Sequence, residues 1–254
     1  MAALALGLFV AGAVFGSFIT VVAHRVPRGE SFVTGRSRCP ACGARVEARD
    51  NVPVLSWLLL RGRCRSCGQP ISPRYPLAEL GLGVLWAGTY LALGDDEVAE
   101  LVLGLILCSA LVAITLTDLD LQLIPNAIVG PVAVVGILIA ALAEPASLDQ
   151  RAIGAAAGGG FLLLIALAYP RGMGMGDVKL VAMMGIYLGR AIAPAILIGF
   201  AAGALVGAAM IARHGSDARK RAIPFGPFLA LGGVVGLWFG DEIVDWYVDE
   251  FFTP

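Results

Sequence analysis

The chain of 254 residues has few charged side chains. Only 15% of its residues are Asp, Glu, Lys or Arg, whereas 58% are apolar and the mean hydropathy is +0.84. An ordinary soluble domain has about 25% charged residues. The shortage of charge excludes a soluble globular protein and a disordered one, and a net charge of −1 provides no basic field for binding nucleic acid. The composition predicts a polytopic membrane protein whose surface is mostly in contact with lipid.

Charge is completely missing from residues 1–23. A cleaved signal peptide needs a basic segment before its apolar core, and none is present. At 1.5 Å per residue this run is long enough to cross a hydrocarbon core of about 30 Å. We therefore expect a retained first transmembrane helix. Seven further apolar runs follow, at 76–93, 98–117, 127–143, 152–169, 178–188, 191–212 and 224–240. The prediction is an all-α fold with about eight transmembrane helices.

The loop at 24–75 indicates the orientation of these helices. It contains ten arginines and only three acidic residues, a net charge of +7. Positive loops remain in the cytoplasm. With eight spans, the acidic turn at 94–97, the turn at 144–150 and the acidic tail after Gly240 then lie outside, whereas the basic loop at 213–223 lies inside. The expected topology has both termini outside, and its domains are a first helix (1–23), a cytoplasmic loop domain (24–75) and a membrane-embedded domain (76–254).

One predicted span is short. Asp177 and Arg190 are separated by 13 steps, or about 20 Å of helix, so one of the two must lie below the membrane surface. We favour Asp177. In the preceding span, Gly154 and Gly158 form a small-residue face suited to close helix packing, although such faces are common in membrane helices.

Four cysteines occur as two CxxCG motifs within the 24–75 loop. Two intervening residues allow both thiolates of a motif to point at one ion from a tight turn, and the following glycine permits that turn. Two disulfides or free thiols are the alternatives, but a cytoplasmic loop is reducing. The pattern predicts a structural Zn²⁺ held by four thiolates, which would order this small polar loop. The predicted ligands are Cys39, Cys42, Cys64 and Cys67.

Carboxylates at the ends of two apolar runs are the candidates for catalysis. Asp118 and Asp120 end the third span, and Asp177 follows a glycine-rich segment before the short span. An acid at the membrane edge is costly and is a functional candidate by default. Both sites fall on the predicted cytoplasmic side. Two close carboxylates can divide the roles of acid and base and activate a water molecule. The alternative is that these aspartates only terminate or cap their helices.

Taken together, these motifs resemble the bacterial prepilin peptidases. The resemblance is carried by Gly-x-Gly-Asp at 174–177, by an aspartate seven residues before the proline of Ile-Pro-Asn at 124–126, and by the two CxxCG motifs. The segments 25–31, 57–64 and 71–76 are also similar to the family. The resemblance covers nearly the whole chain and preserves the order of the motifs.

The resemblance implies a GxGD-type aspartic protease of the bacterial inner membrane, with its active site at the cytoplasmic face. By position, Asp118 and Asp177 would be the catalytic residues, and Asp120 is the substitute if Asp118 is assigned wrongly. The implied substrates are prepilins and pseudopilins, each with a short basic leader ahead of an apolar helix. Many members also N-methylate the new N-terminus with S-adenosylmethionine. The sequence has no glycine-rich strand–turn–helix fingerprint for such a donor, so methyl transfer rests on the resemblance alone.

Two other classes of protein remain as alternatives. A proton-coupled transporter could relay ions through the three aspartates, but it would predict inverted repeats with broken helices, and no internal symmetry is evident. A zinc-stabilised membrane scaffold would use the cysteine loop to bind a partner and the aspartates only as caps. Inactivity of the purified protein on any prepilin would favour the scaffold.

Overall fold

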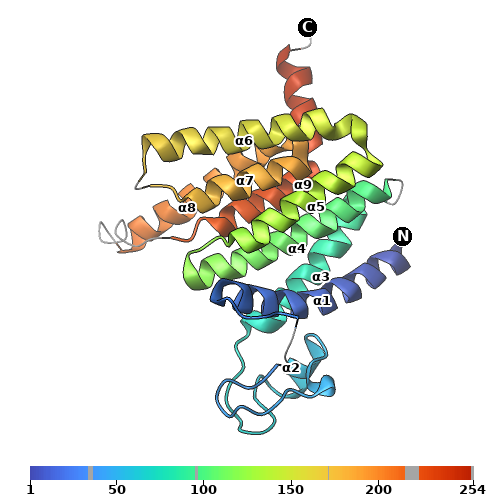
Figure 1. Cartoon of the computed structure of the whole chain (residues 1–254), viewed down its shortest axis with the longest axis vertical. Helices are drawn as coiled ribbons and strands as arrows, with labels where there is room; N and C mark the ends of the chain where they lie inside the picture. Colours follow the sequence, from blue (N-terminus) through green and yellow to red (C-terminus); the bar gives the residue numbers. More distant parts are fainter. Residues whose placement is uncertain (34–36, 95–96, 171, 215–222, 253–254) are drawn as a thin grey trace. The chain divides into compact units, whose positions relative to one another are not determined.

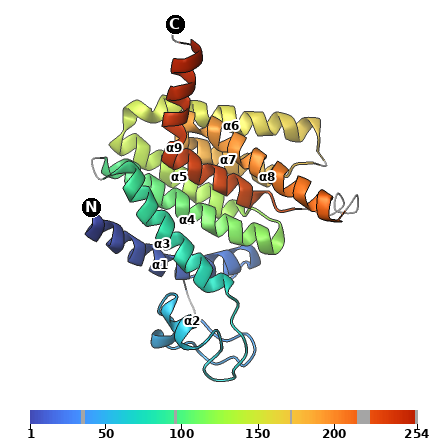
Figure 2. The ribbon, with the colours of Figure 1, turned by 180° about the vertical axis from the view of Figure 1, so that it is seen from behind.

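The computed structural model describes residues 1–33, 37–94, 97–170, 172–214 and 223–252, and over these ranges it is helical with no β-strand (Figures 1 and 2). The prediction of an all-α fold is confirmed. The chain divides into two compact units, Met1–Asp95 and Asp96–Pro254. Arg36, part of the 94–97 turn and most of the 213–223 loop, which entered the topology prediction, lie outside the described residues.

The first unit contains two long helices, α1 (Ala2–Arg25) and α3 (Arg74–Leu93), which pack against each other. Glycines allow this close approach. A Cβ atom on Gly12 would lie 2.9 Å from the carbonyl oxygen of Leu82, and one on Gly83 would lie 2.7 Å from that of Phe9. Three short helices lie in the connecting segment: η1 (Val26–Arg28), η2 (Ala48–Asp50) and α2 (Leu55–Leu59).

Among the described residues, the second unit contains six long helices that pack as a bundle. Its helices are α4 (Val98–Leu121), α5 (Asn126–Ala143), α6 (Leu148–Ala168), α7 (Met175–Leu188), α8 (Ile192–His214) and α9 (Gly226–Phe252), with short η3 (Pro145–Ser147) and η4 (Gly189–Ala191). Helix α6 packs on α7, and α8 packs on α9. Gly154 of α6 and Gly185 of α7 bring the two backbones together, because a Cβ on Gly185 would lie 2.5 Å from the carbonyl of Gly154. The predicted small-residue face of α6 therefore packs against α7.

Seven stretches of the described chain are long and apolar enough to cross a membrane. One of them, Met175–Arg213, has 39 residues and would measure about 58 Å as a single helix, roughly twice the hydrocarbon core. It consists of α7, η4 and α8, with the break at Gly189, whose φ is +53°. In both views α7 begins and α8 ends on the same side of the bundle (Figures 1 and 2). This stretch therefore crosses twice, in agreement with about eight spans.

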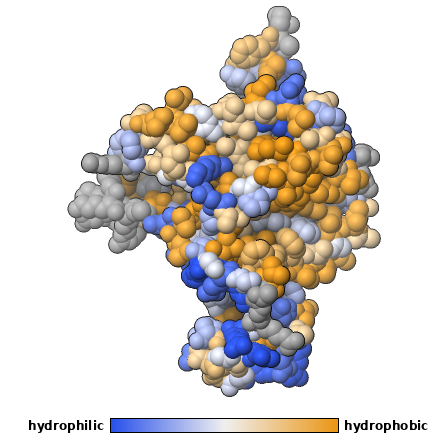
Figure 3. Space-filling model, viewed as in Figure 1, coloured by the Kyte–Doolittle hydropathy of each residue, from blue (hydrophilic) through white to orange (hydrophobic). Residues whose placement is uncertain are grey.

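Large apolar side chains are exposed along the helices of the second unit, as a lipid-facing surface requires. Leu142 is 85% exposed, and Leu197 and Leu205 are each more than 70% exposed. On the face drawn in Figure 3, apolar residues cover much of the helical part. The chain is a multi-pass membrane protein.

Candidate active site and metal centre

Asp118 lies in the last turn of α4 and is buried, with 6% of the residue exposed. Its carboxylate accepts a hydrogen bond of 2.7 Å from the backbone N–H of Gly226, the first residue of α9. The first N–H groups of a helix have no partner within the helix and carry partial positive charge. The start of α9 therefore satisfies one oxygen of the Asp118 carboxylate.

Gly226 is a site residue that the sequence analysis missed. A Cβ atom at this position would lie 2.8 Å from Oδ2 of Asp118, so any other side chain would displace the carboxylate or the helix. The available signal was a glycine between Phe225 and Pro227 at the start of an apolar run. This segment alone does not reveal which side chain the glycine accommodates.

Asp177 is the third residue of α7. Its carboxylate accepts a hydrogen bond of 3.3 Å from the N–H of Gly174, and its own N–H donates to the carbonyl of Gly174 at 3.1 Å. Asp177 therefore caps its helix, as the alternative interpretation of the sequence expected. This bond occupies one carboxylate oxygen, and the residue is only partly buried, so capping leaves the second oxygen available for chemistry.

The two aspartates are brought to the same end of the second unit. Helix α4 contacts α7, and Asp118 lies in the last turn of α4 whereas Asp177 lies in the first turn of α7. A Cβ on Gly176, next to Asp177, would lie 3.0 Å from the side chain of Ile124, in the segment that follows α4. Within the described chain neither aspartate forms an ion pair.

Asp120 occupies a different position from Asp118. Two residues correspond to about 200° of rotation around a helix, so the two side chains leave α4 on nearly opposite faces. Asp118 is buried against the start of α9, whereas Asp120 is exposed. This placement favours Asp118 over Asp120 as the partner of Asp177.

Lys179 connects the two segments that carry the aspartates. Its ammonium group donates a hydrogen bond of 3.0 Å to Oδ1 of Asn126, the first residue of α5. It therefore bonds the α4–α5 corner and not the carboxylate of Asp177. Together with the contact between Ile124 and Gly176, this bond holds the corner after Asp118 against the start of α7.

The opposite end of the second unit also carries charge, but there it is paired. Arg151 of α6 is buried and bonds the carboxylates of Glu100 and Glu144. It also donates hydrogen bonds of 3.1 and 3.0 Å to the carbonyls of Ile186 and Tyr187 at the end of α7. One guanidinium group therefore connects four helices or their ends. The sequence analysis missed this cluster because Glu100 falls inside a predicted span and Arg151 just outside one.

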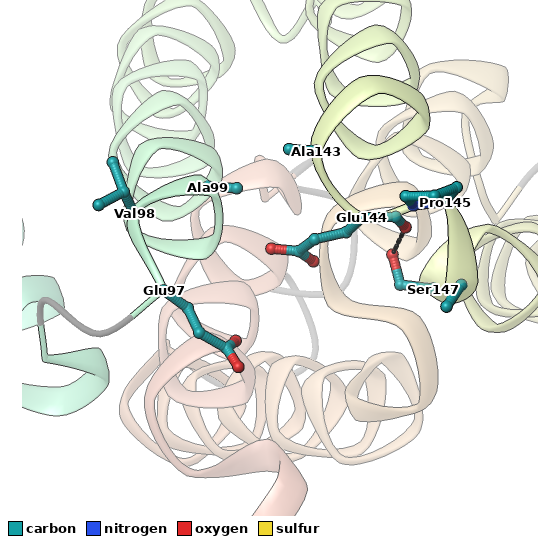
Figure 4. Close-up of a pocket in the computed structure, with 8 residues that line it drawn as sticks. Glu97, Val98, Ala99, Ala143, Glu144, Pro145 and Ser147 are labelled. Carbon is teal, nitrogen blue, oxygen red and sulfur yellow. Dashed lines mark hydrogen bonds between the residues drawn. The ribbon is translucent and has the colours of Figure 1, made fainter.

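A shallow hollow lies beside this paired cluster and not beside the aspartates (Figure 4). Alanine and proline side chains form much of its lining, and the carboxyl groups of Glu97 and Glu144 extend into it from two sides. Ser147 closes one edge, where its hydroxyl donates a hydrogen bond of 2.8 Å to the carbonyl of Glu144. The hollow contains neither of the candidate catalytic residues.

The four predicted metal ligands of the first unit lie together, with all four sulfur atoms within 4.8 Å of one another. The two motifs fold alike. The N–H of Gly43 donates to the carbonyl of Cys39, and the N–H of Gly68 donates to that of Cys64, both at 2.9 Å, with φ near +70° at each glycine. All five cysteines are free thiols, so the disulfide alternative is not observed.

The spacing and the electrostatics of the sulfur atoms suit a tetrahedral ion. The sulfurs of Cys39 and Cys67 are 3.8 Å apart, close to the edge of about 3.8 Å for a tetrahedron with Zn–S bonds of about 2.3 Å. The backbone N–H groups of Cys42 and Ala41 lower the pKa of Cys39 to about 6. An N–H of Gln69 lowers the pKa of Cys67, but burial and the other three thiols raise it to about 12. A divalent cation would allow all four to ionise together.

A bidentate ion pair attaches the second motif to the rest of the loop. Arg65 donates to both carboxylate oxygens of Asp50 at 2.6 to 3.0 Å. This hydrogen bonding lowers the pKa of Asp50 and raises that of Arg65. The side chain between the cysteines of the second motif thus connects it to η2.

Comparison with known proteins gives a consistent result for both units. Residues 10–93 match the bacterial peptidase A24 N-terminal domain, and residues 105–212 match the type IV leader peptidase family. A prepilin leader peptidase/N-methyltransferase from Aeromonas hydrophila is 36% identical, with 96% of this chain and 93% of the relative aligned. A protein with the same name from Bacillus subtilis (strain 168) is 36% identical, with 95% of this chain and 96% of the relative aligned. Another from Burkholderia pseudomallei (strain K96243) is 38% identical, with 91% of this chain and 84% of the relative aligned. No solved structure matches the chain. The chain belongs to the type IV leader peptidase family.

Proposed function

We propose that this chain removes the leader peptide from type IV prepilins and pseudopilins, with Asp118 and Asp177 as the catalytic pair. The observation that carries the proposal is the placement of these carboxylates. They come from two helices, lie at one end of the bundle, and accept hydrogen bonds from backbone N–H groups without a cationic partner in the described chain. Such a pair can divide acid and base roles at neutral pH.

The proposed reaction is hydrolysis of the peptide bond that joins the leader to the apolar helix. One aspartate takes a proton from water, and the resulting hydroxide attacks the scissile carbonyl. The other aspartate supplies the proton that the departing amine needs. Gly174 is exposed and a Cβ there would meet only its own turn, so an extended substrate has room to approach Asp177 beside it.

The proposed location of this reaction is the cytoplasmic face of a bacterial inner membrane, with both termini of the chain outside. A prepilin in the bilayer has its apolar helix in lipid and its basic leader in the cytoplasm, so the bond to be cut lies at the interface. The two aspartates lie at helix ends, as a scissile bond at the interface requires. The orientation is supported by the basic loop at 24–75, because loops rich in Lys and Arg remain in the cytoplasm.

The test is leader cleavage in detergent or nanodiscs by wild type and the Asp118→Asn, Asp177→Asn and Asp120→Asn variants. Removal of a general acid or base lowers rates by about 10²- to 10⁴-fold. We expect this loss for the first two variants and near wild-type cleavage for Asp120→Asn, whose side chain is exposed on another face of α4. Equal cleavage by all four proteins would contradict the aspartate mechanism.

We also propose that the chain methylates the new N-terminus of its product with S-adenosylmethionine. The support is the shared name of the relatives, which cover nearly the whole chain. Mass spectrometry of cleaved product, with and without labelled donor, tests this step separately from cleavage. Product that is cleaved but unmethylated in the presence of donor would contradict it.

The third part of the proposal is that Cys39, Cys42, Cys64 and Cys67 hold a structural Zn²⁺ in the loop domain at 24–75. A closed four-thiolate shell leaves no position for water, so the ion orders the loop and takes no part in hydrolysis. Elemental analysis should show zinc in wild type and in the Cys108→Ser control, and little in Cys39→Ser or Cys64→Ser. Unchanged zinc in the last two variants would contradict the assignment.

Zinc retention should also depend on pH. Metal ligation requires thiolates, and protons compete with the ion for them. Because the bound ion itself stabilises the thiolates, we expect zinc to be retained at neutral pH and released only at a pH below the value of about 6 to which the pKa of the metal-free Cys39 is lowered, as followed by a chromogenic chelator. Zinc that is retained unchanged in strong acid would contradict ligation by four thiolates.

A further inference from the structure

We propose that α2 anchors the cysteine loop to the membrane by placing three leucines in the anionic headgroup layer. These leucines, Leu55, Leu58 and Leu59, are here named the leucine edge. They follow the spacing i, i+3, i+4, which places them on one face of a helix. Their exposed fractions are 59%, 57% and 83%. Adjacent exposed leucines on an otherwise polar loop indicate a binding surface.

The other face of α2 is fixed to the first unit. Ser56 is buried, and the indole N–H of Trp57 donates a hydrogen bond of 3.0 Å to the carbonyl of Ile71. Gly62, with φ +66°, lies against the Trp57 ring, where a Cβ would be 2.8 Å away. The exposure of the leucine edge is therefore a fixed feature of the fold.

A hydrogen bond holds the start of α2 beside the first turns of α3, a helix long and apolar enough to span a membrane. The N–H of Val54 donates a hydrogen bond of 2.8 Å to the carboxylate of Glu79, which is buried on α3. Glu79 is five residues after Arg74, the first residue of α3, or about 7.5 Å along the helix. Interfacial segments bury their apolar face about 5–10 Å into the headgroup and acyl boundary. The leucine edge is therefore within reach of lipid.

Charge favours an anionic lipid surface as the occupant. Arg61 and Arg63 follow α2, are exposed and have no ion-pair partner in the described chain, whereas Arg49 and Arg65 pair with acidic residues of the loop. Arginines next to an inserted apolar edge bind the phosphates of anionic lipids, and each contributes about fivefold to binding. A protein surface would need matching acidic groups to satisfy the same arginines.

Photo-crosslinking of the full-length protein tests this proposal without reference to its catalytic activity. We would place p-benzoylphenylalanine at position 59, or at exposed Ser66 as a matched control, in nanodiscs that contain phosphatidylglycerol. The expected result is lipid adducts at position 59 and few at position 66, with unchanged zinc content. Addition of Arg61→Gln or Arg63→Gln should each reduce the adducts by up to about fivefold.

Two controls keep the outcome decisive. Leu58→Glu combined with the probe at 59 should abolish lipid adducts, whereas Leu58→Ile should retain them. Crosslinks from position 59 to peptides of residues 97–252 would show that the leucine edge packs on the second unit, and would overturn the proposal. Absence of lipid adducts at position 59 would also overturn it.

Discussion

The two ends of the helical bundle carry charge in opposite ways. Helix α4 has Glu100 near its start and Asp118 near its end, 18 residues and about 27 Å apart. Glu100 belongs to a cluster in which a buried arginine bonds two carboxylates and two carbonyls. Asp118 has a single backbone N–H as its described partner. Helix α7 shows the same polarity, with Asp177 at its start and the carbonyls bound by Arg151 at its end.

From this difference we infer that the paired charges stabilise the fold, whereas the unpaired carboxylates take part in the proposed reaction. A buried charge is costly unless it is paired, and the Arg151 end satisfies this requirement within the protein. The Asp118 end does not, and unpaired carboxylates persist where function requires them. We therefore expect substitutions at the Arg151 end to change stability and those at the aspartate end to change activity.

The largest effect should come from Arg151→Met. Removal of one partner from a buried charge cluster costs about 3–5 kcal/mol, and Glu100 would be left without its cation. The matched control is Arg190→Met. Arg190 also pairs with two aspartates, but its side chain is 44% exposed, so the loss should be within about 1 kcal/mol. Thermal unfolding of both variants in the same detergent measures the difference, and equal losses would contradict a structural role for the paired cluster.

Gly226→Ala tests the aspartate end. The new methyl group would displace the carboxylate of Asp118, and misplacement of a reacting group by about 1 Å can cost about 100-fold in rate. We expect cleavage to fall by about 10- to 100-fold. Gly130→Ala is the control, because a Cβ at Gly130 has no other atom within 4 Å. Equal rates for the two variants would show that Asp118 does not need the start of α9.

A smaller effect is expected from the bond between Lys179 and Asn126. This bond is exposed, and its loss through Lys179→Met should lower cleavage by up to about fivefold. Lys179→Arg retains the donor and should be closer to wild type. If the pair acts as one unit, Lys179→Met combined with Asn126→Leu should be no slower than either single variant. Additive losses would indicate that the two residues act separately.

The sequence predicted the features that follow from local patterns. Apolar runs are set by residues adjacent in the chain, so the helix ends were predicted to within four residues, with one exception. Helix α9 continues through the acidic segment to Phe252, 12 residues beyond the predicted end at Gly240. The glycine that follows each CxxC pair predicted a tight turn, which the structure has at Gly43 and Gly68. The four sulfurs cluster as the two motifs predicted. Asp118, Asp120 and Asp177 were candidates because an acid at the membrane edge is costly, and the family resemblance favoured Asp118 and Asp177 among them.

Contacts between distant segments could not be predicted in the same way. Gly226 is 108 residues from Asp118, and its role depends on how α9 begins against the end of α4. The Arg151 cluster likewise joins residues from α4, α5, α6 and α7, and each of its charges looks like an ordinary helix-end residue by itself. The bond between Lys179 and Asn126 joins residues 53 positions apart, and no local pattern indicated it. These contacts depend on how the helices pack in three dimensions, and the local patterns of a single sequence do not reveal that packing.

The most direct test of the contrast between the two ends is to measure unfolding temperature and leader cleavage on the same Asp118→Asn sample. Asparagine keeps an oxygen for the Gly226 N–H and removes the unpaired charge. We predict loss of cleavage by at least about 100-fold with an unfolding temperature equal to or above that of wild type. A fall in unfolding temperature as large as that of Arg151→Met would contradict this interpretation and show that Asp118 is a structural cap of α9.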